Sequence, residues 1–217
     1  PIEKNAIKNA LLAISQIEVA VKTFWTKIGD RIPKEEIAQI GVTFGESEVR
    51  HFDAYSRLLE VLDLNDAFSQ LLTNPVIQGR VDYLTKYLKG ASENSNENYT
   101  LSLTLFSLFV ENISLFSQFL IIKAFNKHKK HLKDVDNVVD ATMKEEQIHA
   151  LFGVYLIQVI KEECPEWFNE DFYRKIYRAS QKAYEAEEKI IDWIFEKGEL
   201  DFLPKQVVKE FVKGRFN

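Results

Sequence analysis

Apolar residues recur at close to 3.6-residue spacing along most of the chain, a pattern that predicts amphipathic helices. The first helix is expected over residues 5–28. Pro33 suits the first turn of a second helix, over residues 34–62. Gly41 and Gly45 lie inside this second helix, where each is about 1 kcal/mol less favourable than Ala. Their presence there indicates close packing or a kink.

The rest of the chain continues the alternation of helical and connecting patterns. Further helices are expected over residues 76–88, 99–125, 134–163 and 169–197. Irregular connections are expected over residues 63–75, over the polar stretch 90–98 and around Pro165, and Leu203-Pro204 opens a last segment. The basic residues 127–131 suit the carboxyl end of the helix before them. The pattern predicts an all-α bundle of six or more helices in one domain, residues 1–217.

Composition supports this class. Only 8 Gly and 5 Pro occur in 217 residues, while 46% of the residues are hydrophobic and 28% are charged. Such a chain is neither a disordered linker nor a turn-rich β-sandwich. The start lacks Met and the end lacks a closing turn, so we expect an N-terminal segment and a C-terminal tail in a longer protein.

Charge and cysteine content exclude several functions. The formal net charge of −5 makes nucleic acid an unsuitable partner, because phosphate binding needs a basic face. The single Cys164 excludes a disulfide framework and a CxxC site, and the cytoplasm is the default compartment. The first 30 residues show no secretory signal.

Two Glu-x-x-His pairs are the first candidates for chemistry: Glu48 with His51, and Glu146 with His149. On a helix, positions i and i+3 share a face, so each pair offers a carboxylate and an imidazole to one metal ion. Either pair alone is weak support, because a Glu three residues from a His is common by chance.

Glu111 is the only charged side chain in residues 99–122. A membrane span is the less favoured interpretation of this apolar stretch, because Ser, Thr, Asn and Gln are scattered through it. A helix that is apolar all round is typical of a bundle interior, where a lone carboxylate must be neutralised or paired. A protonated or hydrogen-bonded Glu remains the plain alternative to metal ligation.

Taken together, four helices supply Glu18, Glu48-x-x-His51, Glu111 and Glu146-x-x-His149 in chain order. This is the two-metal carboxylate pattern of ferritin-like bundles. Four carboxylates would also balance two divalent ions. The joint pattern therefore predicts a ferritin-like bundle without membrane attachment, holding a dimetal centre.

Tyr55 follows His51 by four residues and shares its face with Glu48. A phenol there would lie beside the metal pair and could lose an electron and a proton. A core Tyr with a bonded hydroxyl is the alternative. Phe119, eight residues after Glu111, could keep such a radical dry, and core packing accounts for it equally well.

The sequence resembles the small, radical-generating subunit of class I ribonucleotide reductase. The segments that carry the resemblance are SEVRHFDAYSRLLEVL from Ser47 and KEEQIHALFG from Lys144, with Glu18 and Glu111 in supporting matches. The resemblance implies two iron or manganese ions, as Fe/Fe, Mn/Mn or Mn/Fe. Their ligands would be Glu18, Glu48, His51, Glu111, Glu146 and His149.

The same resemblance implies that Tyr55 stores a tyrosyl radical, which passes to a cysteine of a separate large subunit that reduces ribonucleotides. It also implies a homodimer and, in some subclasses, a flavoprotein activator. The first ligand is Glu18 where many members have Asp, which leaves the metals open. Glu145 stands where the family has a relay Asp, and Trp25 lies too late in the chain for the family's relay Trp. Iron oxidation and storage by a ferritin-like protein, another dimetal-carboxylate oxidase and a metal-free scaffold are the rival interpretations.

Overall fold

The computed structural model describes residues 1–90 and 95–216. Within those residues the secondary structure is helical, apart from turns and one isolated bridge. The principal helices in chain order are α1 (Ile2–Val21), α2 (Glu35–Val61), α3 (Asn65–Leu71), α4 (Pro75–Gly90), α5 (Asn96–Leu105), α6 (Phe116–Lys129), α7 (Lys133–Glu163), α8 (Glu170–Ile194) and α9 (Lys205–Phe216). Shorter segments of tighter or wider helix are η1 (Trp25–Asp30), η2 (Phe106–Ser114) and η3 (Pro165–Trp167). The predicted all-α class is confirmed.

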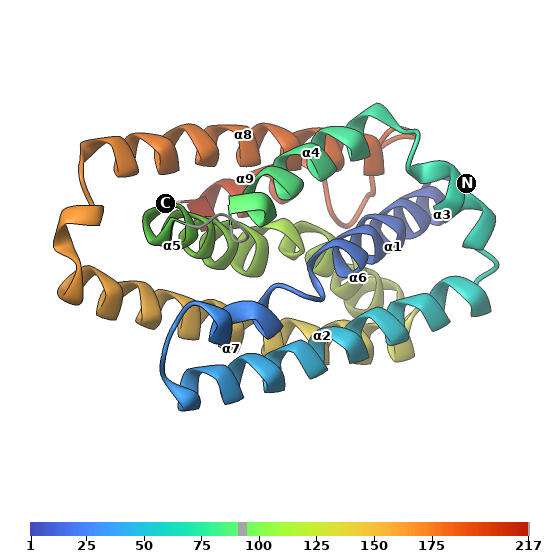
Figure 1. Cartoon of the computed structure of the whole chain (residues 1–217). Helices are drawn as coiled ribbons and strands as arrows, with labels where there is room; N and C mark the ends of the chain where they lie inside the picture. Colours follow the sequence, from blue (N-terminus) through green and yellow to red (C-terminus); the bar gives the residue numbers. More distant parts are fainter. Residues whose placement is uncertain (91–94, 217) are drawn as a thin grey trace.

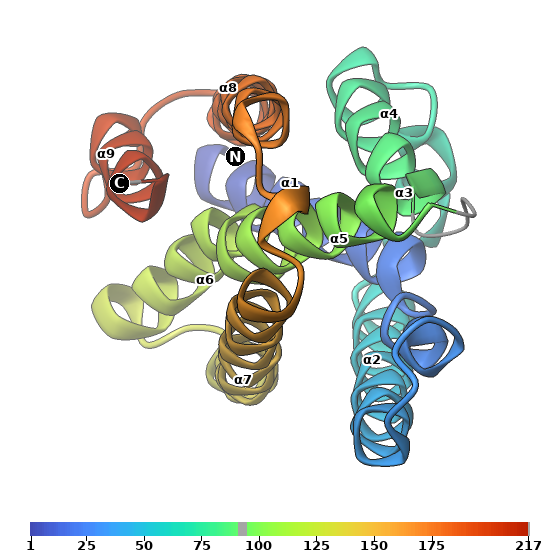
Figure 2. The ribbon, with the colours of Figure 1, turned by 60° about the vertical axis from the view of Figure 1, so that its left-hand side comes forward.

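The helices form a bundle around a central run made of α5, η2 and α6. Figure 1 shows α2 and α7 along one side of this run and α8 along the other. In the turned view of Figure 2, α1 and α5 lie at the centre, α2 and α7 extend away together, and α4 and α8 lie opposite them. The four helical stretches that carry the predicted ligands are therefore neighbours in space.

The first predicted helix is wrong at its end. We expected it to continue to residue 28, but α1 stops at Val21 and the chain turns into the 3₁₀ segment η1. Aromatic packing is the physical reason. Phe24 stacks on Phe106 with ring centroids 3.6 Å apart, and Trp25 is fully buried beside Phe44. Burying these rings is more favourable than continuing one helix past the core.

The close packing predicted from Gly41 and Gly45 is confirmed. A Cβ atom built on Gly41 would collide with the Trp25 carbonyl oxygen and with Ile28, and one on Gly45 would collide with Thr26. The two glycines lie one turn apart and let α2 approach η1 at backbone distance. This approach brings Trp25 close to the ligand-bearing helix.

Three further expectations need correction. Residues 65–71 of the expected irregular connection form α3, because the segment has an apolar side to bury, including Leu71. The expected loop 90–98 is shorter, since α4 reaches Gly90 and α5 starts at Asn96, capped by the Ser95 hydroxyl. Residues 91–94 of that loop lie outside the described residues. The last segment forms a helix, α9.

The apolar stretch predicted as one helix contains a π-helical interruption, η2, over nine residues. A π-helix has more than 3.6 residues per turn and is found often at functional sites. The Ser114 hydroxyl donates to the Phe109 carbonyl oxygen five residues back, at 3.0 Å. Glu111 lies within this segment, so its direction is set by the wider turn.

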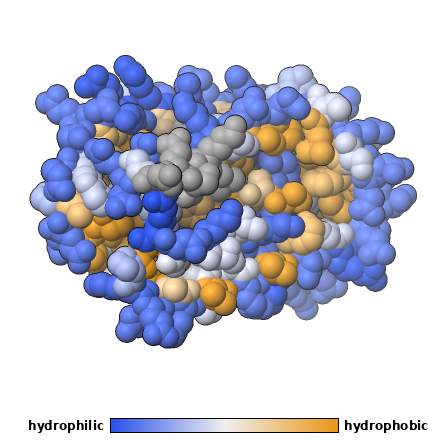
Figure 3. Space-filling model, viewed as in Figure 1, coloured by the Kyte–Doolittle hydropathy of each residue, from blue (hydrophilic) through white to orange (hydrophobic). Residues whose placement is uncertain are grey.

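Residues 96–129 form a helical stretch with the length and apolar composition of a membrane span, the only such stretch in the described part of the chain. Its most apolar window is 83% buried inside the bundle. This burial agrees with the predicted position of Glu111 in a bundle interior. Elsewhere the face seen in Figure 3 is mostly hydrophilic and is interrupted by apolar patches.

A buried ion pair joins α4 and α8, on the side of the central run opposite α2 and α7 (Figure 2). Arg80 of α4 and Glu187 of α8 are fully buried, with 3.1 Å between Arg80 Nη2 and Glu187 Oε1. Arg80 also donates to the carbonyl oxygen of Ala13, to that of Ser114 and to the side chain of Gln118. One guanidinium thus joins α4 to four other helical segments, α1, η2, α6 and α8.

Candidate metal centre

All six residues predicted as metal ligands lie together in the interior of the bundle. Glu18 comes from α1, Glu111 from η2, and each Glu-x-x-His pair from α2 or α7. None is more than 4% exposed. The carboxylate and the imidazole of each pair lie side by side because they are three residues apart on the buried face of α2 or α7.

The donor atoms fall into two groups of four. One group is Glu18, Glu48, His51 and Glu146, and the other is Glu48, Glu111, Glu146 and His149. Within each group one donor atom per residue lies within 4.8 Å of the others. Glu48 and Glu146 belong to both groups. Two cations held in these groups would therefore share two carboxylates.

The histidines face the carboxylates through their Nδ1 atoms. His149 Nδ1 is 3.1 Å from Glu48 Oε1 and 3.3 Å from Glu146 Oε2. His51 Nδ1 is 3.0 Å from Glu146 Oε1 and 3.9 Å from a Glu18 oxygen. Both imidazoles therefore face Glu48 as well as Glu146, since His51 Nδ1 also lies 3.9 Å from a Glu48 oxygen.

Several buried polar atoms of the cluster lack hydrogen-bond partners, as the ligands of a cation would. Buried side-chain atoms without a hydrogen-bond partner include both carboxylate oxygens of Glu18 and of Glu48, and Nδ1 of His51 and of His149. Leaving buried charged groups without partners is costly, by more than the 1–3 kcal/mol of a neutral group. Six such atoms that face one another are what a metal site requires, because cations would satisfy all of them.

Without cations, the cluster shares protons. Burial and the neighbouring Glu146 raise the pKa of Glu111 to about 8. Burial, followed by repulsion from Glu146, also raises the pKa of Glu18. Burial lowers the pKa of His149, but the facing carboxylates of Glu111, Glu146 and Glu48 outweigh burial and raise the value to about 12. Protons therefore compete with cations for these atoms.

Two residues outside the cluster contact the Nε2 atoms of the histidines. His149 Nε2 lies 3.0 Å from Ser47 Oγ, and His51 Nε2 lies 2.6 Å from Glu145 Oε2. Such outer partners orient a ligating ring and fix which nitrogen carries the proton. Glu145, predicted as a relay residue, thus touches one of the predicted ligands.

Trp25 is the residue that sequence analysis missed most clearly. Its indole nitrogen donates a hydrogen bond to Glu111 Oε1 at 2.5 Å. We considered Trp25 only as the family's relay Trp and rejected it because of its position in the chain. Nothing in the local pattern linked it to Glu111, 86 residues later. Ser47, directly before Glu48, was equally missed. Its only signal was a small hydroxyl on the buried side of α2.

Tyr55 is 1% exposed, and its hydroxyl donates to Thr142 Oγ1 at 3.4 Å. Burial and the negative charge of Glu18 raise its pKa well above the usual value, so the phenol stays protonated. Phe119 is buried too, and its ring makes an edge contact with Phe116, as core packing predicts. A part for Phe119 in shielding a radical stays a prediction.

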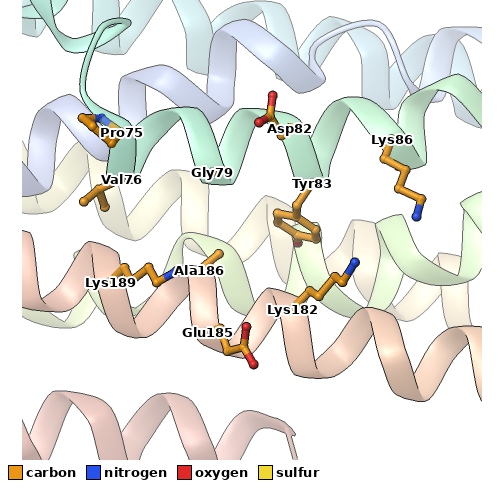
Figure 4. A pocket seen from close by; sticks show the side chains of 10 residues that line it. All are labelled: Pro75, Val76, Gly79, Asp82, Tyr83, Lys86, Lys182, Glu185, Ala186 and Lys189. Atoms are coloured by element: carbon orange, nitrogen blue, oxygen red, sulfur yellow. The ribbon is translucent and has the colours of Figure 1, made fainter.

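A surface cavity of about 370 Å³ between α4 and α8 is separate from the cluster. Figure 4 shows Lys86 and Lys182 on the same side of the Tyr83 ring, with Glu185 on the opposite helix from Asp82. Its lining residues include none of the six clustered side chains. The chemistry that the sequence predicts therefore concerns the buried cluster and not this cavity.

The fold and the buried cluster define a ferritin-like helical bundle with a two-centre carboxylate and histidine site. A sequence model of the family described as ribonucleotide reductase, small chain, matches residues 1–217. The chain belongs to this family.

Curated relatives agree with the family. A probable ribonucleoside-diphosphate reductase small subunit of Invertebrate iridescent virus 3 is 21% identical, over 97% of this chain and 60% of its own length. The ribonucleoside-diphosphate reductase subunit beta of Chlamydia pneumoniae is 27% identical, over 67% of this chain and 39% of its own length. The chain thus spans about 60% or less of the curated relatives it matches.

Solved structures show the same fold. The ribonucleotide reductase R2 subunit of Clostridium botulinum superposes with a TM-score of 0.87 at 14% identity, over 99% of this chain and 68% of that one. Dimanganese(II)-NrdF of Streptococcus sanguinis superposes with a TM-score of 0.83 at 16% sequence identity, over 100% of this chain and 74% of that one. An R2-like ligand-binding oxidase with a Mn/Fe cofactor superposes with a TM-score of 0.79 at 19% sequence identity, over 100% of this chain and 79% of that one.

Proposed function

We propose that this chain is the metal-bearing part of a class I ribonucleotide reductase small subunit. The observation that carries the proposal is the pair of four-donor groups sharing Glu48 and Glu146, in a chain of this family. The proposed ligands are Glu18, Glu48, His51, Glu111, Glu146 and His149. The metals would be iron, manganese or one of each, which agrees with the manganese-containing proteins of the same fold.

Bound redox-active metals, once treated with an oxidant, would supply the oxidising equivalent that the subunit stores. The chain's own contribution is a buried, neutral phenol. One-electron oxidation of Tyr55 also releases its hydroxyl proton, and Thr142 Oγ1 accepts a hydrogen bond from that hydroxyl. Burial of Tyr55 keeps water and reductants away from the radical. We propose Tyr55 as the radical residue and Glu145 as a relay residue beside His51.

The proposed partner is a ribonucleotide reductase large subunit, which would use the stored radical to reduce ribonucleoside diphosphates to deoxyribonucleotides. The proposal includes an activating flavoprotein as a source of oxidant. The cytoplasm is the proposed compartment, as the cysteine content suggested.

A homodimer is also proposed, and an exposed apolar stripe on α7 supports it. Ile148, Leu151 and Tyr155 lie at i, i+3 and i+7 and are 56%, 71% and 62% exposed. A continuous apolar stripe on an outer helix face is typical of an interaction surface. Because a two-fold interface uses the same surface patch on both copies, the stripe of a second copy can cover this one.

The test is reconstitution followed by electron paramagnetic resonance. Protein loaded with iron or manganese and then treated with oxidant should show a stable tyrosyl signal, and Tyr55→Phe should abolish it. His149→Ala should remove about one of two bound metal equivalents while the helical circular dichroism stays unchanged. Metal binding without any radical would favour the rival, a dimetal oxidase or iron-storage protein. Absence of stoichiometric metal would favour a metal-free scaffold and contradict the proposal.

A further inference from the structure

Four side chains form a line of polar contacts from the surface of α2 to the buried cluster. Arg50 donates to Glu46 on its own helix and, through Nη2, to Glu145 Oε1 on α7 at 2.9 Å. The other oxygen of Glu145 lies 2.6 Å from His51 Nε2. The line thus leaves α2 at Arg50, crosses to α7 and returns to α2 at His51.

Glu145 needs an anchor for this arrangement. Its side chain is 36% exposed and has three rotatable bonds, so water competes with His51 for its oxygens. Arg50 occupies Oε1 and leaves Oε2 for His51. Arg50 is itself fixed, because the planar guanidinium also bonds to Glu46 one turn earlier. The carboxylate of Glu145 is therefore held at both oxygens.

The orientation of His51 follows from this carboxylate. With Nε2 donating to Glu145, the lone pair of the neutral ring lies on Nδ1. Nδ1 is the atom that faces Glu146 at 3.0 Å and Glu18 at 3.9 Å. A cation in that group of donors needs this nitrogen deprotonated and correctly aimed.

We propose that Arg50 is a positioning residue for the two-cation site: it holds Glu145 so that Glu145 fixes the His51 ring with Nδ1 toward Glu18, Glu48 and Glu146. The inference rests on the proposed function, since it takes the six-residue cluster to be a metal site. Arg50 itself touches none of the proposed ligands in the contacts described, and it acts through Glu145.

Arg57 supplies a matched control on the same helix. It is 68% exposed and bonds to Glu60 on its own helix, three residues away. The substitution Arg57→Gln therefore removes a surface arginine and an intrahelical pair, as Arg50→Gln does, without removing a contact to Glu145. A general effect of surface charge on metal binding would appear in both variants.

The experiment is an anaerobic Mn²⁺ titration of the intact chain, with free Mn²⁺ measured by electron paramagnetic resonance. Arg50→Gln should weaken one of the two Mn²⁺ sites by about tenfold, the lower end of the effect of an outer-partner mutation. Arg50→Lys should give an intermediate affinity, because an ammonium keeps the charge and loses the fork. Arg57→Gln should match the wild type.

A second readout separates positioning from general stability. In Zn²⁺-loaded protein labelled with ¹⁵N-histidine, the slowly exchanging Nε2–H signal of His51 should weaken or disappear in Arg50→Gln. The corresponding signal of His149, which faces Ser47, should stay and serves as an internal reference. Unchanged affinity and an unchanged His51 signal in Arg50→Gln would overturn the role of Arg50 and leave the metal site standing. A wild type that binds no Mn²⁺ would instead overturn the proposed function, and this inference with it.

Discussion

The Trp25 indole nitrogen lies 2.5 Å from Glu111 Oε1 and donates a hydrogen bond to it. The bond joins the 3₁₀ segment η1 to the π-helical segment η2, and the two residues are 86 positions apart in the sequence. Side chains leave a 3₁₀ or π-helical turn in directions that differ from those of a regular α-helix. The geometry of the cluster at Glu111 therefore depends on how the chain departs from regular helix.

Replacement of Trp25 by Phe should loosen Glu111 without emptying the core. The variant keeps an aromatic ring beside Phe44 and Phe106 but lacks the donor. We expect a Mn²⁺ affinity about tenfold lower and an unfolding free energy lower by about 1–3 kcal/mol. Equilibrium titration and urea denaturation measure the two effects. Trp167→Phe, in η3 and away from the cluster, is the control, and equal metal affinity in both variants would contradict the role of Trp25.

The stability of the metal-free protein should fall as pH rises. The pKa of Glu111 is raised in the folded state from 4.5 to about 8, and that of His149 from 6.5 to about 12. A raised pKa means that the folded state binds the proton more tightly than the unfolded state. The Glu111 contribution is therefore complete below about pH 4.5 and declines up to about pH 8. The His149 contribution is complete below about pH 6.5 and declines up to about pH 12.

Thermal unfolding of metal-free protein between pH 5.5 and 8.5 measures this slope. Glu111→Gln removes one titrating group and should flatten the curve. Metal should stabilise more at pH 8.5 than at pH 5.5, because fewer protons compete for the ligands. A melting temperature of metal-free protein that rises across this range would contradict the proton-sharing description of the cluster.

Arg80→Ala should destabilise the fold strongly. The substitution leaves Glu187 as a buried carboxylate without its cation, and it frees the carbonyl oxygens of Ala13 and Ser114. Loss of one partner of a buried ion pair costs about 3–5 kcal/mol. Burial already raises the pKa of Glu187 against the opposing effect of Arg80. Glu187 should therefore take up a proton in the variant, which makes the loss larger at high pH than at low pH.

Urea denaturation at pH 5.5 and at pH 8.5 checks this prediction. The double variant Arg80→Met/Glu187→Leu should recover part of the lost stability, because neither buried charge remains. A loss below about 1 kcal/mol in Arg80→Ala would show that the pair is not the connection between helices that its contacts indicate.

Leu151→Asp should separate the proposed dimer. Leu151 is the most exposed residue of the α7 stripe, at 71%. A charge there would be desolvated against a second copy of itself, which opposes association. Leu72→Asp is the matched control, because Leu72 is 52% exposed in the turn between α3 and α4. Sedimentation over a range of concentrations should show a dimer for the wild type and the control. A wild type that remains a monomer would contradict the proposed interface.

Local periodicity determined most of the helical architecture. Helix α2 was predicted to within a residue at each end, because Pro33 and the apolar spacing act over one or two turns. The clustering of Glu48, His51, Glu111, Glu146 and His149 also followed from sequence, since i, i+3 spacing and a lone charge in an apolar helix are local signals. Glu18 has neither signal, and only the joint pattern of four helices predicted it.

Only the tertiary structure decided the end of α1, the π-helical turns around Glu111 and the outer partners of the cluster. Trp25, Ser47 and Arg50 make contacts with residues 86 to 102 positions away. Such contacts depend on which helix faces lie together, on aromatic packing and on the close approach that Gly41 and Gly45 allow. Periodicity sets which side of each helix is buried, but the free energy of packing the whole bundle sets what meets that side.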